Sequence, residues 1–312
     1  MGIYNEYSRL EEVILGISPK IFLQKDMPKD MEAGISKIDK GFYRLGLSII
    51  RNKPVPDWIS RRFQAELDSL NKVLVANGVF VHRLDPIEPL IHEPEGLIQM
   101  FPRDLAMTVG SHFIIGNLQM PMRKKEYRGF EKLLPVILQN RLQISSIDPL
   151  SGNFLEGGDV IVDDPYIFVG INTYATNLAG LRWLESEVGK DFKIVPVHIK
   201  DPSIMHLDCC MTIIGPKMAV INKASLVYPL PDPLKDFDFI EVNSKTRKEL
   251  GTNVLVIEPG TVVVQKRHMD LQERLKVRGF NVITIEFTYH AKIFGAFRCA
   301  TCPIRRSNNN IK

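Results

Sequence analysis

The sequence has little of three things, and each scarcity excludes a class of protein. Its 4 cysteines in 312 residues are too few for the disulfide scaffold of a small secreted protein. No apolar run approaches the roughly 18 residues of a membrane-spanning helix, and the polar start MGIYNEYSRLEE is unlike a secretory signal. Lys and Arg do not cluster with aromatic residues, and the net charge is only +4. We therefore expect a cytoplasmic protein that binds neither membranes nor nucleic acid.

The residues that are present suit a folded domain with a chemically active thiol. Hydrophobic residues make up 45% of the chain, enough for a sizeable core. Cys209 and Cys210 lie in an apolar stretch, and we interpret them as packing residues. Cys299 and Cys302 form the pair CATC, a spacing shared by metal sites, redox pairs and single nucleophiles with a bystander. A zinc site usually needs a second ligand pair, which the sequence lacks, so no metal is expected.

One pattern recurs along the chain: two β-branched runs around a turn, then a helix, then a further strand. The turns contain Gly, Asp or Pro, as hairpins require. The hairpins are predicted to begin at residues 106, 159, 211 and 254. Helices are predicted after three of them, at 127–138, 176–189 and 269–279, and the helix after the third hairpin is less clear. The predicted closing strands lie at 142–147, 193–199 and 281–287.

A fifth copy is predicted to be divided between the two ends of the chain. The run ATCPIRR at 300–306 is expected to pair with EEVILGI at 11–17. A helix over 58–77, with an apolar stripe and Asp57 as its N-cap, and a strand at 79–84 complete this unit.

Five such units predict an α/β fold with fivefold pseudosymmetry, a propeller of ββαβ units closed through both termini. Closure of this kind removes most open sheet edges. The whole chain, 1–312, then forms a single domain. The segments 18–56 and 85–100 fall outside the repeat and are punctuated by Pro, Lys and Gly, so we interpret them as lids.

Polar residues stand at the same place in every unit, just before the hairpin. In chain order they are Asp104, Glu156, His206 with Asp208, Thr252 with Asn253, and Cys299. If rotation relates the units, these corners converge, and a thiol, an imidazole and three carboxylates share one pocket.

Each of these motifs also has a purely structural explanation. EGGD is a turn, FPRD is a proline turn with an ion pair, and a lone histidine is more often structural than catalytic. We interpret Asp159 and Arg103 in this way, as residues that orient their neighbours. For the others, the shared position in the repeat favours a site.

A pocket of carboxylates and one thiol predicts a cationic substrate. Carboxylates repel one another unless a cation lies between them, and a thiolate beside them needs a positive group such as Arg298, His206 or the substrate. A guanidinium is planar, permanently charged and matches carboxylates with its fork of donors. Its central carbon is open to attack by the thiolate of Cys299. Asp104 and Asp208 are then predicted to hold the guanidinium nitrogens.

The acid–base role falls to the histidine of the same pocket. His206, positioned and kept protonated by Glu156, is predicted to act first as general acid and then as general base.

The motifs NEYSRLEEVILG, FPRDLAMTVG, MHLDCCMTIIGP, TNVLVIE and FRCATCPIRR together resemble the guanidino-group-modifying (pentein) superfamily. They are most similar to its glycine amidinotransferase branch, with arginine deiminases and dimethylargininases as relatives. The resemblance implies a fivefold propeller, a covalent amidino-cysteine intermediate and no metal or organic cofactor. It implies Cys299 as the nucleophile, with His206 and Glu156 as its acid–base pair. It also implies guanidinium binding by Asp104 and Asp208.

The sequence departs from the family's pattern in places that bear on substrate binding. Glu156 stands in the deiminase-like form EGGD, where amidinotransferases often have Asp or Asn. The arginine that grips the substrate carboxylate after the third hairpin is missing, and only Lys223 lies there. Arg298 remains as a candidate clamp, and the resemblance implies that Cys302 is a bystander.

Three functions follow from these residues. The first is an amidinotransferase that moves the amidino group of arginine, or of a close analogue, to an amine. The second is a hydrolase acting through the same intermediate, and the third is a non-catalytic guanidinium-binding protein, which would have no need of a thiol. The expected partners are a small guanidine and an amine acceptor, and the sequence permits a homodimer without indicating one.

Overall fold

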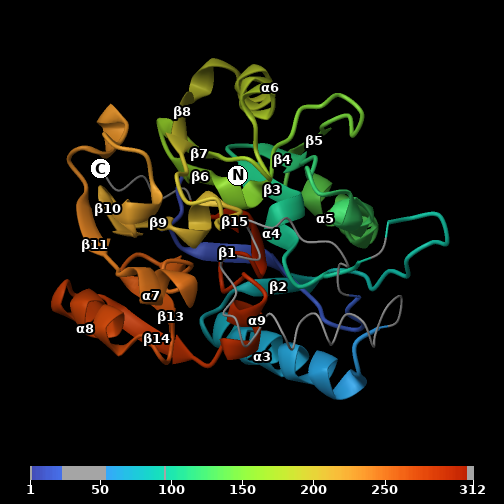
Figure 1. The fold of residues 1–312 in the computed structure, drawn as a ribbon, viewed down its shortest axis with the longest axis horizontal. Coiled ribbons are helices and arrows are strands. Elements are labelled where there is room, and N and C mark those ends of the chain that lie inside the picture. Colours follow the sequence, from blue (N-terminus) through green and yellow to red (C-terminus); the bar gives the residue numbers. More distant parts are fainter. Residues whose placement is uncertain (1, 23–53, 95, 308–312) are drawn as a thin grey trace.

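The computed structural model describes residues 2–22, 54–94 and 96–307, and the strands in these ranges form five three-stranded sheets. Each sheet consists of an antiparallel pair and a third strand that joins the pair in parallel. In Figure 1 four of the sheets follow one another around the molecule, coloured from green through yellow and orange to red, and the fifth combines blue β1, cyan β2 and red β15. The repeated strand order fits the pseudosymmetric α/β fold predicted from the sequence.

Four of the units are contiguous in the chain, and their hairpins lie where the sequence predicted them. The first contains β3 (Ala106–Val109), β4 (His112–Ile115) and β5 (Gln143–Ser146). The second contains β6 (Val160–Asp163), β7 (Tyr166–Ile171) and β8 (Lys193–His198). The third contains β9 (Met211–Gly215), β10 (Met218–Ile221) and β11 (Asp238–Glu241). The fourth contains β12 (Leu255–Glu258), β13 (Thr261–Gln265) and β14 (Asn281–Ile285).

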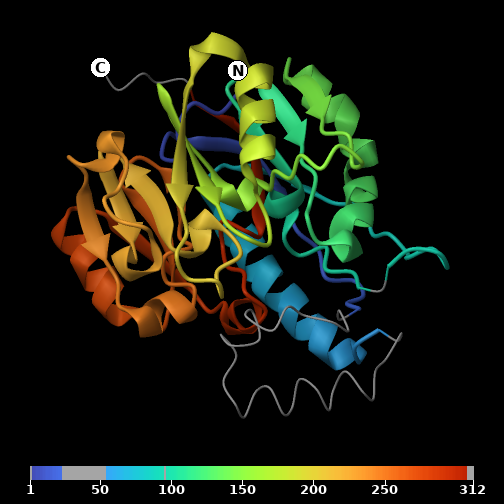
Figure 2. The same ribbon diagram turned by 45° about the horizontal axis from the view of Figure 1, so that its top comes forward.

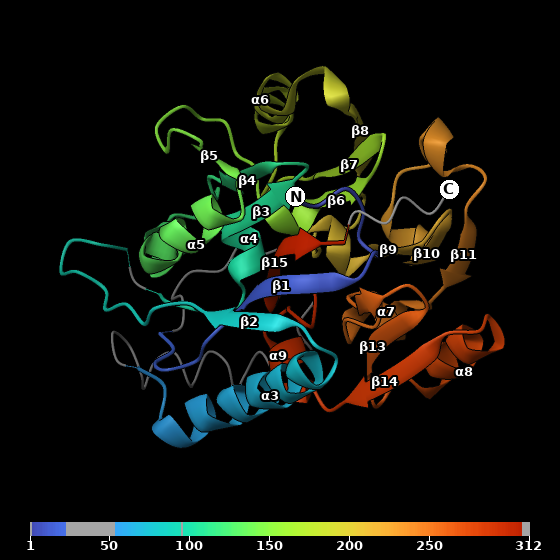
Figure 3. The same ribbon diagram turned by 180° about the vertical axis from the view of Figure 1, so that it is seen from behind.

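The fifth unit is divided between the chain ends, as predicted. β15 (Thr301–Arg306) pairs antiparallel with β1 (Leu10–Leu15), which pairs in parallel with β2 (Phe80–Arg83). Figure 3 shows the three strands side by side, with α3 (Asp57–Ala76) running past β2. This sheet fixes the end of the chain, and therefore the loop that carries Cys299 immediately before β15.

Helix α3 buries one face, as its apolar spacing predicted. Phe63, Leu67 and Leu70 are buried on that face, whereas Trp58 on the other side is exposed. The prediction of Asp57 as the N-cap was wrong. Pro56 occupies the N-cap position without a side-chain hydrogen bond, and Asp57 is the first helical residue.

Helices join the second and third strands of several units. α6 (Leu178–Val188) and α8 (Met269–Val277) occur where the sequence predicted them, and both lie on the outside of the molecule beside their own sheets (Figures 1 and 2). α6 is continued by the turn η3 (Gly189–Asp191).

The helices of the first and third units differ from a single α-helix. In the first, a 3₁₀ helix η1 (Pro121–Leu133) is followed by α5 (Leu134–Gln139) rather than by the one helix predicted. Pro135 lacks an amide hydrogen, so it is tolerated only at the start of the new helix. In the third unit, the helix that was unclear in the sequence consists of two single turns, η5 (Lys223–Ser225) and η6 (Asp232–Leu234).

Two further short helices, α7 (Ser244–Lys248) and α9 (Thr288–Lys292), were not predicted. Each lies just before one of the polar corners, α7 before Asn253 and α9 before Cys299.

The segments interpreted as lids are described only in part. Most of 18–56 lies outside the described residues, whereas 85–100, apart from residue 95, contains an isolated bridge but no named helix or strand. The side chain of Gln99 links two parts of this segment, because it accepts a hydrogen bond from the amide of Ile87 and donates one to the carbonyl of Asp85. Among the described helices, none has the length and apolarity needed to cross a membrane.

Candidate active site

Single helical turns precede three of the hairpins, and the predicted polar residues lie in these turns or directly before them. α4 (Pro102–Leu105) holds Asp104, η2 (Gly157–Asp159) begins after Glu156, and η4 (Leu207–Cys209) begins after His206. The turn η2 contacts both α4 and η4, so the corners of three different units meet, as the repeat predicted.

His206 lies between two carboxylates in the interior of the protein. Its Nε2 donates to Glu156 Oε2 at 2.8 Å, and its Nδ1 lies 3.6 Å from Asp104 Oδ1. Burial alone lowers the pKa of His206, but the charge of Asp104 and the hydrogen bond and charge of Glu156 outweigh it. They hold that pKa well above its ordinary value, which favours the protonated, proton-donating form of the imidazole.

The motif EGGD brings the chain close enough for this contact. A Cβ at Gly158 would lie 2.7 Å from Cγ of the His206 ring, and one at Gly157 would lie 2.2 Å from the carbonyl oxygen of Arg103. Glycine at both positions therefore lets the second corner pack directly against the first and third corners.

Asp159 orients the loop that carries the histidine. Its carboxylate accepts from the backbone amides of Leu207 and Thr176, at 2.9 and 3.3 Å. Burial raises the pKa of Asp159 to about 7, although the nearby charge of His206 opposes the increase. These contacts agree with the structural role expected for this residue.

Cys299 is held by the third and fourth corners. Its Sγ lies 3.7 and 3.6 Å from the two carboxylate oxygens of Asp208, and it accepts a hydrogen bond from Asn253 Nδ2 at 3.1 Å. Asn253 Oδ1 in turn accepts from the backbone amides of Arg298 and Cys299. Asn253 therefore fixes both the sulfur and the backbone beneath it, a role that the sequence analysis did not assign.

Arg123 is a residue of the site that the sequence analysis did not name. It donates to Asp104 Oδ2 and to Glu126, and it is buried with both carboxylates. Asp104 Oδ1 is left without a hydrogen-bond partner among the described residues. The only signal in the sequence was an Arg–Glu pair three residues apart, which is common on solvent-exposed helices.

Arg298 does not have the position of a substrate clamp. Its side chain is only 1% exposed, and it donates to Asp208 Oδ2 at 3.0 Å, to Glu6 Oε1 at 2.9 Å and to the carbonyl of Val160. Burial by itself lowers the pKa of Arg298, but Glu6 and Asp208 raise it overall. The guanidinium is thus engaged internally, where it compensates the charge of Asp208.

The remaining cysteines have different surroundings. Cys302 lies in another part of the core, against Ala106, and burial raises its pKa to about 12, so it is an inert thiol. Cys209 does more than pack, because its Sγ lies 3.6 Å from Asp208 Oδ1 and beside Cys299. One donor atom each from Asp208, Cys209 and Cys299 lies within 4.8 Å of the others, a set that could hold a thiophilic metal ion at the cost of the nucleophile.

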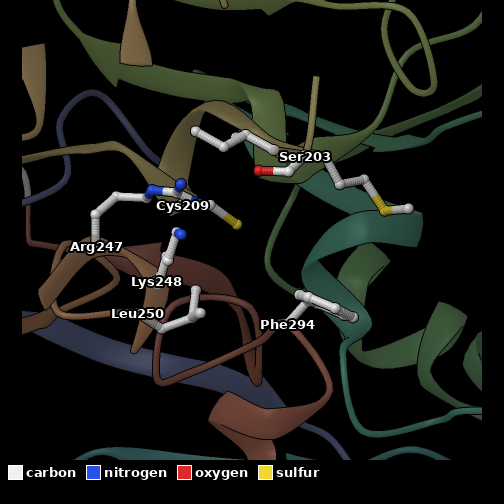
Figure 4. A pocket seen from close by; sticks show the side chains of 8 residues that line it. Ser203, Cys209, Arg247, Lys248, Leu250 and Phe294 are labelled. Atoms are coloured by element: carbon white, nitrogen blue, oxygen red, sulfur yellow. The ribbon is translucent and has the colours of Figure 1, made fainter. Parts of the chain in front are cut away.

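A pocket opens beside Cys209, and Figure 4 shows the side chains around it. Its walls come from the segments that lead into the third, fourth and fifth corners. The lining residues are Ser203, Ile204, Met205, Cys209, Arg247, Lys248, Leu250 and Phe294.

Comparison with known proteins places this chain in a family. The model of the family described as N,N dimethylarginine dimethylhydrolase, eukaryotic, matches residues 53–306. The Bacillus subtilis protein named "Uncharacterized protein YkgA" is 32% identical over 209 residues, which cover 67% of this chain and 70% of that protein. The mitochondrial glycine amidinotransferase of Gallus gallus is 24% identical over 357 residues, covering 97% of this chain and 82% of the relative.

A solved structure shows the same fold. The inosamine-phosphate amidinotransferase StrB1 from Streptomyces griseus superposes with a TM-score of 0.82 at 22% identity, covering 98% of this chain and 97% of that one. The chain therefore belongs to the dimethylarginine dimethylhydrolase family and, with it, to the guanidino-group-modifying (pentein) superfamily, close to the glycine amidinotransferases. This confirms the resemblance carried by the sequence motifs, and it makes the chain a member of an enzyme family of amidinotransferases and related hydrolases.

Proposed function

We propose that this family member moves the amidino group of arginine, or of a related guanidine, to an amine acceptor through an amidino-cysteine on Cys299. The observation that carries the proposal is the histidine held protonated by Glu156 and Asp104, next to a corner where Asp208 contacts the thiol. A proton donor, a nucleophile and carboxylates for a cation are the groups that this reaction requires.

The guanidinium would be bound by the two aspartates. Asp104 offers its Oδ1, which has no hydrogen-bond partner among the described residues, and Asp208 offers the oxygen that Arg298 does not use. Each contact is a charge-assisted hydrogen bond in a buried site, worth about 1.5–3 kcal/mol. The bound cation also compensates Asp208 and so favours the thiolate of Cys299.

The first half-reaction is attack by the sulfur on the central guanidinium carbon. The C–N bond to the substrate's alkyl amine then breaks, and His206 gives its proton to the departing nitrogen. The amidino group remains on sulfur as a thiouronium. Asn253 supports the sulfur through the hydrogen bond that it donates at 3.1 Å.

The second half-reaction reverses these roles. Neutral His206 removes a proton from the incoming amine, the amine attacks the thiouronium carbon, and the C–S bond breaks. This regenerates the thiolate and the protonated histidine, so the cycle needs neither metal nor organic cofactor. A small guanidine and an amine are then the two partners.

A hydrolase is the second candidate, and the family match favours it, because the matching family is named for a dimethylhydrolase. In this route a terminal nitrogen of the guanidinium leaves as ammonia or a small amine, and water attacks the intermediate. His206 would activate that water as it would activate an amine. A non-catalytic guanidinium-binding role gains no support from a thiol held beside a carboxylate and an amide.

The architecture completes the proposal. We propose that the five units close into a propeller that forms one domain over 1–312, so that all five corners face a common pocket. We propose that the protein acts in the cytoplasm, and the residues named above all come from one chain.

Mass spectrometry of the enzyme incubated with arginine alone tests the proposal. Amidino transfer leaves only the amidino group on the Cys299 peptide, a mass increase of about 42 Da. The hydrolytic route through loss of ammonia leaves the whole carbon skeleton attached, an increase of about 157 Da. The smaller adduct, discharged by amines faster than by water, is the expected result. The larger adduct with release of citrulline would assign the hydrolase.

A further inference from the structure

The proposed site leaves one end of the substrate without a partner. The two basic residues that the sequence offered for a substrate carboxylate are both engaged elsewhere. Arg298 is bound to Asp208 and Glu6 in the core. Lys223 lies over the ring of Phe239 and 3.9 Å from Glu241. If the substrate carries an anionic group, another part of the molecule must bind it.

The pocket shown in Figure 4 adjoins the nucleophile. Cys209 forms part of its wall, and Asp208 Oδ1 lies 3.6 Å from the Sγ of Cys209 and 3.7 Å from that of Cys299. A guanidinium held at Asp208 would therefore extend its remaining chain past Cys209 and into this pocket.

Two basic side chains of α7 line the pocket. Arg247 is 8% exposed and pairs with Asp201 at 2.8 Å, and its Nε has no hydrogen-bond partner among the described residues. Lys248 is exposed and forms no ion pair or hydrogen bond with another residue in the part of the chain that the structure describes. Figure 4 shows its amino group pointing into the same space as the sulfur of Cys209.

The apolar wall of the pocket has an unusual backbone. Leu250 and Phe294 line it, and they are two of the few described non-glycine residues with positive φ, at 59° and 68°. Such conformations cost of order 1–3 kcal/mol, are kept only where surrounding contacts impose them, and cluster at ligand sites. Together with Ile204 and Met205 they provide an apolar passage suited to a chain of methylene groups.

We propose that this pocket binds the carboxylate of an aliphatic guanidino acid, with Lys248 and Arg247 as its anion-binding residues. Asp201 already compensates one of the two positive charges, so the pocket matches a single negative charge rather than a phosphate dianion. The inference rests on the proposed function, because it requires the guanidinium to lie at Asp208. It makes α7 the element that replaces the missing carboxylate-binding arginine.

The test compares arginine with agmatine, which differs from it only by lacking the carboxylate. The variants are Lys248→Met and, as a matched control on the same helix, Lys245→Met, which does not line the pocket. For Lys248→Met we expect kcat/KM for arginine to fall roughly ten- to a hundredfold, as for loss of one charge-assisted hydrogen bond. The value for agmatine should stay nearly unchanged, and Lys245→Met should match the wild type with both substrates.

Equal losses for arginine and agmatine, or a wild type that does not distinguish them, would overturn the carboxylate site. A second readout separates this failure from failure of the proposed reaction. Binding of both ligands to Cys299→Ser is measured by calorimetry, with and without Lys248→Met. If arginine binding is weakened by Lys248→Met but the wild type turns over neither compound, the anion site is supported and the proposed reaction is overturned. Weak binding of arginine that is unchanged by Lys248→Met would overturn the anion site.

Discussion

The strongest consequence of the site's geometry concerns Glu156, because its carboxylate controls the proton on His206. The variant Glu156→Gln keeps the shape of the side chain but removes its charge. The hydrogen bond to His206 Nε2 is 2.8 Å long and fully buried, so the lost interaction is worth about 1.5–3 kcal/mol. Since one pKa unit corresponds to about 1.36 kcal/mol, the pKa of His206 should fall by about one to two units.

The sign of the effect follows from which form of His206 does the chemistry. In the proposed mechanism, formation of the amidino-cysteine needs protonated His206 together with the thiolate of Cys299, so on the alkaline side its rate declines as pH rises through the pKa of His206. Glu156→Gln lowers that pKa, and the decline should move to lower pH by about one to two units. At a pH above the pKa of His206 in both proteins, adduct formation by Glu156→Gln should be about ten- to a hundredfold slower than in the wild type.

Rapid-quench measurement of adduct formation on Cys299 isolates this step from the second half-reaction. Glu185→Gln, an exposed position on α6, is the matched control and should leave the profile in place. The reasoning would be refuted if Glu156→Gln slowed the reaction equally at every pH. In that case Glu156 would position the histidine without setting its charge.

Three further predictions follow from the same site. Cys299→Ser should abolish adduct formation, whereas Cys302→Ser should retain most activity because Cys302 faces Ala106 in a separate part of the core; equal losses would restore a paired-cysteine mechanism. Asp104→Asn and Asp208→Asn should each lower kcat/KM about ten- to a hundredfold, and unchanged kinetics in both would mean that neither binds the guanidinium. The purified protein should carry no stoichiometric zinc and be insensitive to chelators, and elemental analysis finding about one zinc per chain would overturn the site assignment.

The strands were predictable because their signals are local. A hairpin needs two β-branched runs and a turn residue within about a dozen positions, and each of the four contiguous units supplies them. The divided fifth unit was also predictable, since four complete units left one unmatched strand near the end of the chain and two unmatched strands and a helix near its start. The helices were less so. The short α7 and α9 have little intrinsic stability, and helices of this length depend on tertiary packing.

The convergence of the corners followed from one argument, namely that residues at the same place in each repeat meet if the repeats are related by rotation. The contacts among Asp104, Glu156 and His206 agree with it. The residues that tune the site escaped prediction because they lie outside the repeat. Arg123 comes from a 3₁₀ helix, and its buried pairing with Asp104 depends on the packing of that helix against α4.

Arg298 shows why adjacency to a nucleophile does not reveal a side chain's role. From sequence, a guanidinium next to Cys299 suggested a clamp for the substrate. In the structure Arg298 donates to Asp208, 90 residues away in sequence, and to Glu6, 292 residues away. No local sequence pattern could predict either partner. A buried arginine must find such partners, because an uncompensated charge in the core is far more costly than an exposed one. Arg298 is therefore paired with Asp208 and Glu6 rather than free for a ligand. In the proposal above, a substrate carboxylate is bound instead by cations that keep a solvent-facing donor. Lys248 meets this condition within the pocket, which is why the comparison of arginine with agmatine also tests how this chain compensates for the arginine that it lacks.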